Sequence, residues 1–295
     1  MKRIFFGAAL AAIVALGAMS APPALAADAL ADAPAGAPAP AKAKPPLLWS
    51  DFPSLFDAFL FGKVDKVGNM DYLALKGDKK LDRFIEAVAT ADLSKFPTWT
   101  LKDKDGKETI DRSVELVFWI NAFNGHVLKT IADAYPVNSP YDIKDFDTAK
   151  THTVAGKTYS LAEMRDKIGK ADPRTIFALI NGTRGGPLLA PAAYRYKDID
   201  YLLTVAVAVF VNLEGNVVVD RIKNTATLNE FFAQADPFFK PSSGRGKWPG
   251  IRAILKTYVE RKVDRNYFTT NDYQIKFKPS DSRVNNRSLT GVTAG

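Results

Sequence analysis

The sequence predicts an α+β fold, in which a single globular domain combines helices with a small, mainly antiparallel sheet. Its composition, with 47% hydrophobic and 24% charged residues, is typical of a chain with a substantial core. Several segments have the apolar periodicity of amphipathic helices, whereas the strand-like segments are short. The two kinds of segment do not alternate as regular βαβ units, which argues against a doubly wound sheet.

The N-terminal residues 1–26 have the features of a signal peptide. Lys2 and Arg3 form a positive start, residues 4–19 are apolar, and residues 24–26 give the small-residue pattern that a signal peptidase requires. The apolar stretch is short for a membrane-spanning helix, and no other stretch approaches the required length. We therefore expect a periplasmic or secreted protein without a stable membrane span.

The composition changes twice after the predicted signal peptide. Residues 27–47 are rich in Ala and Pro and have little to bury, which is typical of a linker. We expect one folded domain over residues 48–287 and a flexible tail over residues 288–295.

The first elements of this domain are predicted from apolar spacing and turn residues. The spacing indicates helices over residues 52–61 and 81–88. Between the second helix and the next one, Asp105-Gly106 predicts the turn of a loop or hairpin.

The strongest periodic pattern runs from Asp111 to Ala132. Six residues at steps of three and four form one stripe of a single helix: Val114, Val117, Asn121, Asn124, Leu128 and Ile131. Two amides therefore interrupt an apolar stripe, and a buried amide needs hydrogen-bond partners. Either the two asparagines bind the backbone of neighbouring segments, or they face a ligand.

The middle of the chain contains turn, cap and strand signals. Ala155-Gly156 predicts a hairpin turn, and Ser160 with Glu163 forms a capping box for a short helix. The apolar run 175–180 predicts a buried strand. The glycine-rich segment 181–187 follows it and lacks the ending of a phosphate-binding loop, so tight turning explains its glycines.

The C-terminal part combines helices and strands. A helix that is apolar nearly all round is expected over residues 199–211, and a strand over residues 216–220. A second capping box at 227–230 predicts the start of a helix, and another helix is expected over residues 250–263. The alternation at 273–277 predicts an edge strand.

Several classes of site are disfavoured by the residue counts. The chain has no cysteine and two histidines, His126 and His152, which are too few and too widely spaced for zinc, so we expect no metal and no cofactor. We expect His126 to be a structural histidine. Residues 240–295 carry twelve Lys and Arg against four acidic residues. This asymmetry is typical either of a solvated face or of a surface for an anionic partner such as lipid headgroups, an acidic glycan or nucleic acid, and export argues against nucleic acid.

The chain resembles the domain of unknown function 547 family over about residues 68–287. The resemblance rests on five strings in the expected order, of which the second is the most specific: GNMDYLALK at 68–76, VFWINAFNG at 117–125, ADPRTIFALINGTRGGPLL at 171–189, AVAVFVN at 206–212 and YQIKFKPSDSRVNN at 273–286. The general arrangement suggests an architecture like that of papain or transglutaminase. The family has largely no established activity.

This chain departs from the family at the positions that would carry chemistry. Members typically have Cys where this chain has Asn181, and often Cys or Ser at Gly186. They commonly have His at the position of Ile176, and a Glu-His pair where this chain has Arg165 and Asp166. The resemblance therefore implies a divergent member that lacks a thiolate and the imidazole to activate it.

Two hypotheses remain for the function. In the first, the protein is a non-catalytic binding or scaffold protein that holds a polar or anionic ligand, with a possible cell-envelope partner. In the second, it is a hydrolase or acyl-transfer enzyme that uses Thr183 as nucleophile or carboxylates such as Asp281 as acid or base. The candidate polar cleft comprises Asn121, Asn124, Arg174, Asn181, Thr183, Asp281 and Asn285.

Overall fold

A computed structural model describes residues 47–102, 104–239, 247–270 and 272–287. The predicted signal peptide, nearly all of the linker and the predicted tail lie outside the described residues. The described residues group into one compact unit. Its helices are α1 Asp51–Leu60, α2 Tyr72–Leu75, α3 Lys79–Ala89, α4 Ser113–Ala134, α5 Leu161–Ala171, α6 Ile199–Asn212, α7 Phe231–Ala235, α8 Pro249–Tyr258 and α9 Lys262–Thr270.

The strands form three small sheets, which confirms the α+β prediction. Two are antiparallel hairpins, β1 Trp99–Lys102 with β2 Glu108–Asp111 and β3 His152–Val154 with β4 Lys157–Tyr159. The third contains β5 Val217–Asp220, β6 Thr225–Asn229 and β7 Gln274–Lys278. In it, β5 pairs with β6 antiparallel, whereas the predicted edge strand β7 runs parallel to β6.

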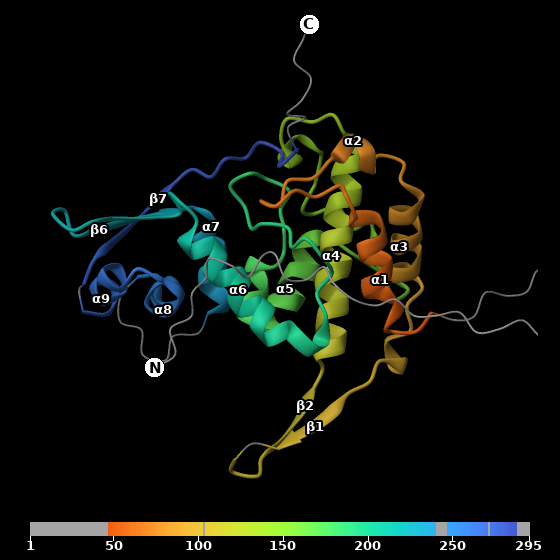
Figure 1. The fold of residues 1–295 in the computed structure, drawn as a ribbon, viewed down its shortest axis with the longest axis horizontal. Helices are drawn as coiled ribbons and strands as arrows, with labels where there is room; N and C mark the ends of the chain where they lie inside the picture. The colour runs from red at the N-terminus through yellow and green to blue at the C-terminus, as the bar shows by residue number, and fades with distance from the viewer. Residues whose placement is uncertain (1–46, 103, 240–246, 271, 288–295) are drawn as a thin grey trace, which may run out of the picture. The chain divides into compact units, whose positions relative to one another are not determined.

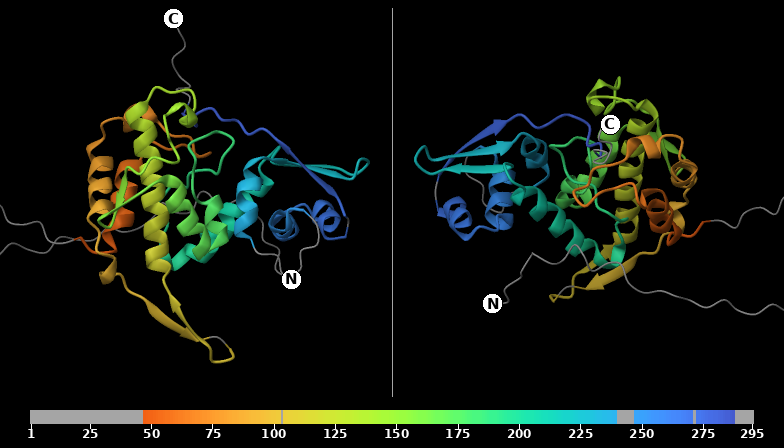
Figure 2. Two further views of the ribbon diagram at one scale, coloured as in Figure 1. Left: turned by 180° about the vertical axis from the view of Figure 1, so that it is seen from behind. Right: turned by 45° about the horizontal axis from the view of Figure 1, so that its top comes forward.

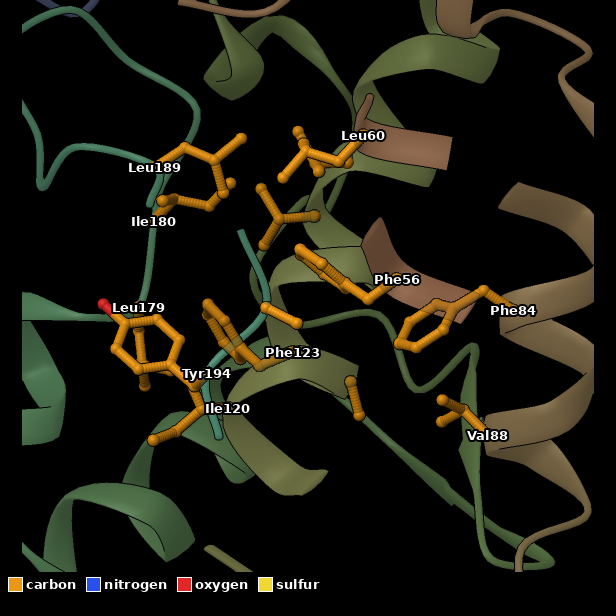
Figure 3. Packing of buried hydrophobic residues seen from close by; sticks show 14 of the residues in the cluster. Phe56, Leu60, Phe84, Val88, Ile120, Phe123, Leu179, Ile180, Leu189 and Tyr194 are labelled. Carbon is orange, nitrogen blue, oxygen red and sulfur yellow. The ribbon is translucent and has the colours of Figure 1, made fainter. Parts of the chain in front are cut away.

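The helices are arranged around α4. Figures 1 and 2 show α1 and α3 on one side of α4, α5 and α6 on the other, and the β5–β7 sheet with α8 and α9 beyond α6. One hydrophobic cluster surrounds α4 (Figure 3), and a second lies between α6, α7, α8, α9 and the third sheet. Short 3₁₀ helices connect these elements at Leu93–Lys95, Pro140–Asp142, Pro173–Phe177, Tyr196–Asp198 and Asp236–Phe238.

The predicted stripe on α4 is confirmed. All six of its residues are buried, although burial extends around most of the helix, from Val117 to Leu128. The helix begins two residues later than expected, since Asp111 is the last residue of β2, and the Asp111 side chain accepts a hydrogen bond from the Ser113 N–H at 2.8 Å.

The prediction of a strand at 175–180 is wrong. The segment instead begins with the 3₁₀ helix Pro173–Phe177, which starts at Asp172, whose carboxylate accepts from the Arg174 N–H. Burial was predicted correctly, because residues 175–180 are all buried. A short apolar run indicates burial without specifying strand or helix, whereas the Asp-Pro pair is a helix-start signal.

The capping box at 227–230 is also assigned differently by the structure. These residues include the end of β6, the central strand of the third sheet, and the helix that follows begins only at Phe231. Ala226 and Leu228 are fully buried in the second cluster, so sheet packing overrides the local signal. The Asn229 side chain then accepts from the Phe231 N–H at 2.9 Å.

The single helix predicted over 250–263 is two helices, α8 and α9, with a break between them. The break is stabilised by Asn212 at the end of α6. Its amide donates to the Tyr258 carbonyl at 2.8 Å and accepts from the Glu260 N–H at 2.9 Å. A long-range partner thus satisfies the backbone groups that a continuous helix would have paired internally.

Gly125 allows α3 and α4 to approach closely. A Cβ atom at this position would lie 2.4 Å from Cε1 of Phe84, which packs edge-on against Phe56 at 5.3 Å. We expect Gly125→Ala to destabilise the fold by about 1–2 kcal/mol, because overpacking outweighs the gain of up to ~1 kcal/mol in helix propensity. Urea unfolding measures this change. Phe84→Leu provides the control, since the alanine should be less harmful in that smaller background.

Candidate functional site

The two asparagines of the α4 stripe each bind one backbone segment. Asn121 donates to the Tyr194 carbonyl and accepts from the Tyr194 N–H, both at 3.0 Å. Asn124 donates to the Ala178 carbonyl and accepts from the Ile180 N–H, again at 3.0 Å. Both side chains are 1% exposed, so each amide holds a loop on the helix in the way that the first of the two alternatives expects.

The loop 181–187 is organised by the Asn181 carboxamide. Its oxygen accepts from the Thr183 N–H at 3.1 Å and from the Thr183 hydroxyl at 2.8 Å, and its nitrogen donates to the Tyr141 hydroxyl at 3.4 Å. Gly186 is needed here because a Cβ would lie 1.9 Å from that oxygen. The Thr183 hydroxyl therefore donates to an amide, which cannot act as a general base.

The chain returns to this loop at residues 281–287. The Gly185 N–H donates to the Asp281 carbonyl at 2.9 Å, and the Asn285 N–H donates to the Gly182 carbonyl at 2.9 Å. The Asn285 side chain accepts from the Tyr72 hydroxyl at 2.8 Å and donates to the Gly68 carbonyl at 3.1 Å. Asn285 thus joins three parts of the chain that are distant in sequence.

Asp281 is ionised at neutral pH. Its carboxylate binds the Arg283 guanidinium at 2.6 Å, and hydrogen bonds from Arg283 lower the pKa of Asp281 to about 2. A carboxyl with so low a pKa is a weak proton acceptor and is not a proton donor near neutral pH.

Arg174 contacts residues outside this loop. It forms ion pairs with Asp172 at 2.7 Å and Asp200 at 2.8 Å, and it donates to the Thr204 hydroxyl at 3.0 Å. It connects the 3₁₀ helix Pro173–Phe177 to the start of α6. Hydrogen bonds with Asp172 raise its pKa, so the guanidinium is always charged.

The seven candidate residues therefore fall into separate groups. Asn181, Thr183, Asp281 and Asn285 meet at the 181–187 loop, and Asn124 reaches the same segment through Ile180. Asn121 binds a different segment, and Arg174 contacts the α6 region. This arrangement ties loops to the helices.

His126 on α4 and His152 on β3 pack against each other, a contact that the sequence did not predict. Their ring centroids are 4.9 Å apart, and His126 is 4% and His152 6% exposed. Within the described ranges, Nε2 of His126 has no hydrogen-bond partner. Burial lowers the pKa of His126 to about 3, helped by the neighbouring His152 and opposed by a backbone hydrogen bond with Thr153.

A pocket of about 500 Å³ adjoins this pair and is termed the histidine pocket. It is lined by both histidines together with the ionisable side chains of Asp82, Glu86, Lys129 and Asp133. Lys129 pairs with Asp133 at 2.6 Å and with Asp82 at 3.6 Å. No set of three His, Asp or Glu residues in the described part of the chain is arranged to hold a metal ion.

A second pocket, of about 330 Å³, lies between α1, the start of α4 and the 3₁₀ helix Tyr196–Asp198. We term it the aromatic pocket. Its lining includes four aromatic rings, those of Trp49, Phe52, Phe118 and Tyr196. The polar side chains that line it are those of Ser50, Ser54, Asn121, Arg195, Lys197 and Asp198.

The walls of the aromatic pocket are held in place by contacts of the lining residues with one another and with residues behind them. Trp99 stacks on Tyr196 with ring centroids 5.5 Å apart, and Trp49 meets Tyr196 edge-on at 5.5 Å. Asp57 of α1 binds the Arg195 guanidinium and accepts from the Ala193 N–H at 2.6 Å. The Asn121 bonds to Tyr194 fix the same segment, so contacts within the protein hold the walls of the pocket.

One feature of the sequence pointed to this pocket, the amide of Asn121 in an apolar stripe. Trp49 precedes the first predicted helix, and Tyr196 lies in a segment for which the sequence pattern predicts no element, so no local pattern indicates that they meet.

No helix in the described ranges is long and apolar enough to cross a membrane.

Comparison with known proteins finds a match to one family model over part of the chain. Residues 108–211 match the model of the family described as "Protein of unknown function, DUF547", which confirms the predicted resemblance over these residues. The matched range includes α4, the 181–187 loop and most of α6. The strings at 68–76 and 273–286 lie outside it. No curated protein and no solved structure matches the chain.

Proposed function

We propose that this protein is an exported, non-catalytic binding protein that holds a polar or anionic, ring-shaped small ligand in the aromatic pocket. The observation that carries the proposal is the combination of four aromatic rings with Arg195 and Lys197 in one preformed pocket. Concave sites with an apolar lining and a few polar groups are typical of small-molecule binding. Export rests on the signal-peptide features of residues 1–26.

The bonding of the candidate catalytic groups favours binding over catalysis. The Thr183 hydroxyl donates to the Asn181 amide, and Asp281 is held ionised by Arg283. Both histidines pack against each other and not against the 181–187 loop. A hydrolase panel in which wild type turns over a substrate, and Thr183→Ala or Asp281→Asn does not, would contradict the non-catalytic proposal.

The lining of the pocket predicts how a ligand would be oriented in it. A planar or ring-shaped body would pack against Trp49 and Tyr196, as aromatic side chains provide large apolar contact areas. Lys197 is the better candidate for an acidic group, because Arg195 is already paired with Asp57. In the described ranges, Lys197 has no ion pair.

Ligand binding can be followed by tryptophan fluorescence, since Trp49 lines the pocket and Trp99 stacks on Tyr196. We expect an acidic ring compound, such as a hexuronic acid or an aromatic carboxylate, to bind more tightly than its neutral counterpart. Lys197→Ala should weaken the acidic compound about fivefold, the equivalent of ~1 kcal/mol, and leave the neutral one unchanged.

Two further variants define this test. Lys256→Ala, an exposed lysine on α8, is the matched control and should bind like wild type. Tyr196→Ala should weaken both compounds by removing a wall of the pocket. If Lys197→Ala and Lys256→Ala bind every compound equally, the pocket does not select an acidic group.

A further inference from the structure

The turn between β5 and β6 presents an isoleucine to solvent. Ile222 is 98% exposed, and Arg221 and Lys223 flank it. Figure 1 shows this hairpin extending away from α6 and α7, with α8 and α9 below it. A fully exposed isoleucine side chain buries no apolar area and so does not stabilise the fold. Its position at a projecting turn is therefore typical of a side chain that contacts another surface.

This turn is held firmly on α9. Arg221 forms an ion pair with Asp264, and its guanidinium lies 6.0 Å from the centre of the Tyr267 ring. The Asn224 side chain accepts from the Tyr267 hydroxyl at 2.8 Å and donates to the Asp272 carbonyl at 2.7 Å. Ile222 is therefore exposed in a turn whose position is fixed by contacts with α9.

The ion pair of Arg221 with Asp264 connects the turn to the start of α9, which carries a second exposed aliphatic residue. Val263 precedes Asp264 on α9 and is 57% exposed. We term the combined surface of residues 221–223 and 261–263 the hairpin tip. It presents two aliphatic side chains from two elements of the fold.

Cations dominate the hairpin tip. Arg221, Lys223, Arg261 and Lys262 all belong to it, and Asp264 beside it is 15% exposed and paired with both arginines. Lys223 is 78% exposed and its ion pair with Asp220 is long, at 3.6 Å. Lys262 has no ion pair within the ranges that the structure describes. With the bordering Asp220, Glu260 and Asp264 counted, four cations stand against three carboxylates, so the net charge around the two aliphatic side chains is +1.

We propose that the hairpin tip docks on the surface of a bilayer that contains anionic phospholipid. Ile222 and Val263 would enter the headgroup region, and the lysine and arginine side chains would extend to the lipid phosphates. Two aliphatic side chains and a few cations provide shallow, reversible and salt-sensitive attachment. This inference is independent of the ligand proposed for the aromatic pocket.

The absence of cysteine from the sequence allows a site-specific test in the full chain. Ile222→Cys is labelled with an environment-sensitive fluorophore and mixed with vesicles of phosphatidylglycerol and phosphatidylcholine. Phe61→Cys, at an 87% exposed position at the end of α1, is the matched control. We expect a blue shift for the label at 222 and none at 61. A local probe is required because residues 1–46 could bind vesicles by themselves.

Binding of unlabelled protein to the same vesicles is then measured by sedimentation. We expect Ile222→Ser to weaken binding about tenfold and Lys223→Gln about fivefold, with Phe61→Ser unchanged. Pure phosphatidylcholine vesicles or 0.5 M salt should abolish the blue shift at position 222. A label at position 222 that does not shift, or that shifts equally on neutral and anionic vesicles, would overturn the proposal. A protein that binds an acidic polysaccharide but does not bind vesicles would overturn it as well.

Discussion

Replacement of Asn124 by leucine is expected to lower the free energy of unfolding by about 4 kcal/mol, because it leaves two buried backbone groups without partners at ~1–3 kcal/mol each. The groups are the Ala178 carbonyl and the Ile180 N–H, which bind the Asn124 amide at 3.0 Å. Ala178 is 1% and Ile180 0% exposed, so water cannot replace the lost bonds. Urea unfolding followed by circular dichroism measures the change.

The control for this variant must share its change in helix propensity. Asn266→Leu provides it, because Asn266 is an exposed residue of α9 and leucine is the better helix former at both positions. We expect that variant to be as stable as wild type or slightly more so. An unchanged unfolding midpoint for Asn124→Leu would mean that the amide does not hold the 178–180 segment.

Acid is expected to destabilise the fold through the buried histidine pair. His126 has a pKa of about 3 in the folded protein against an ordinary value of 6.5, so the unfolded chain binds its proton first as the pH falls. The stability due to the neutral imidazole is complete above pH 6.5 and is lost progressively down to about pH 3. At pH 4 the loss from His126 is about 3 kcal/mol. Burial also lowers the pKa of His152, which acts in the same direction.

Carboxylates whose pKa is lowered in the folded protein, such as Asp281, also make the fold sensitive to acid, so the readout is a difference between variants. Those carboxylates are present in wild type and in the histidine variant alike. The unfolding free energy of His126→Gln should therefore fall less steeply between pH 6.5 and 4 than that of wild type, whatever its value at pH 8. Parallel curves for the two proteins would show that His126 is not held neutral by burial.

The sequence predicted the parts of the fold that depend on local spacing. The α4 stripe, the short hairpins and the edge strand at 273–277 follow from periods of 3.6 and 2 or from turn residues, and the structure has them. The same reasoning failed at 175–180 and 227–230, where neighbours in space decide between helix and strand. An apolar run predicts that a segment is buried, whereas the elements that pack against it decide whether it forms a helix or a strand.

The candidate site was predictable only in part for the same reason. The need of Asn121 and Asn124 for partners followed from their place in an apolar stripe, and the structure supplies backbone partners for both. The residues around the two asparagines do not indicate which segments they bind, because Tyr194 and Ala178 are distant in sequence and reach α4 through tertiary packing. The contact of Trp49 with Tyr196, and that of His126 with His152, had no local signal for the same reason.

The return of residues 283–287 to the 181–187 loop has a consequence for synthesis. The N–H groups of Asn285 and Arg287 donate to the carbonyls of Gly182 and Met70, and the Met70 N–H donates to the Asn285 carbonyl. These late residues bridge two much earlier segments, whose backbone groups lack their final partners until the ribosome has added Arg287. A nascent chain can therefore form its helices early, but it cannot close this junction until residues 283–287 have been made.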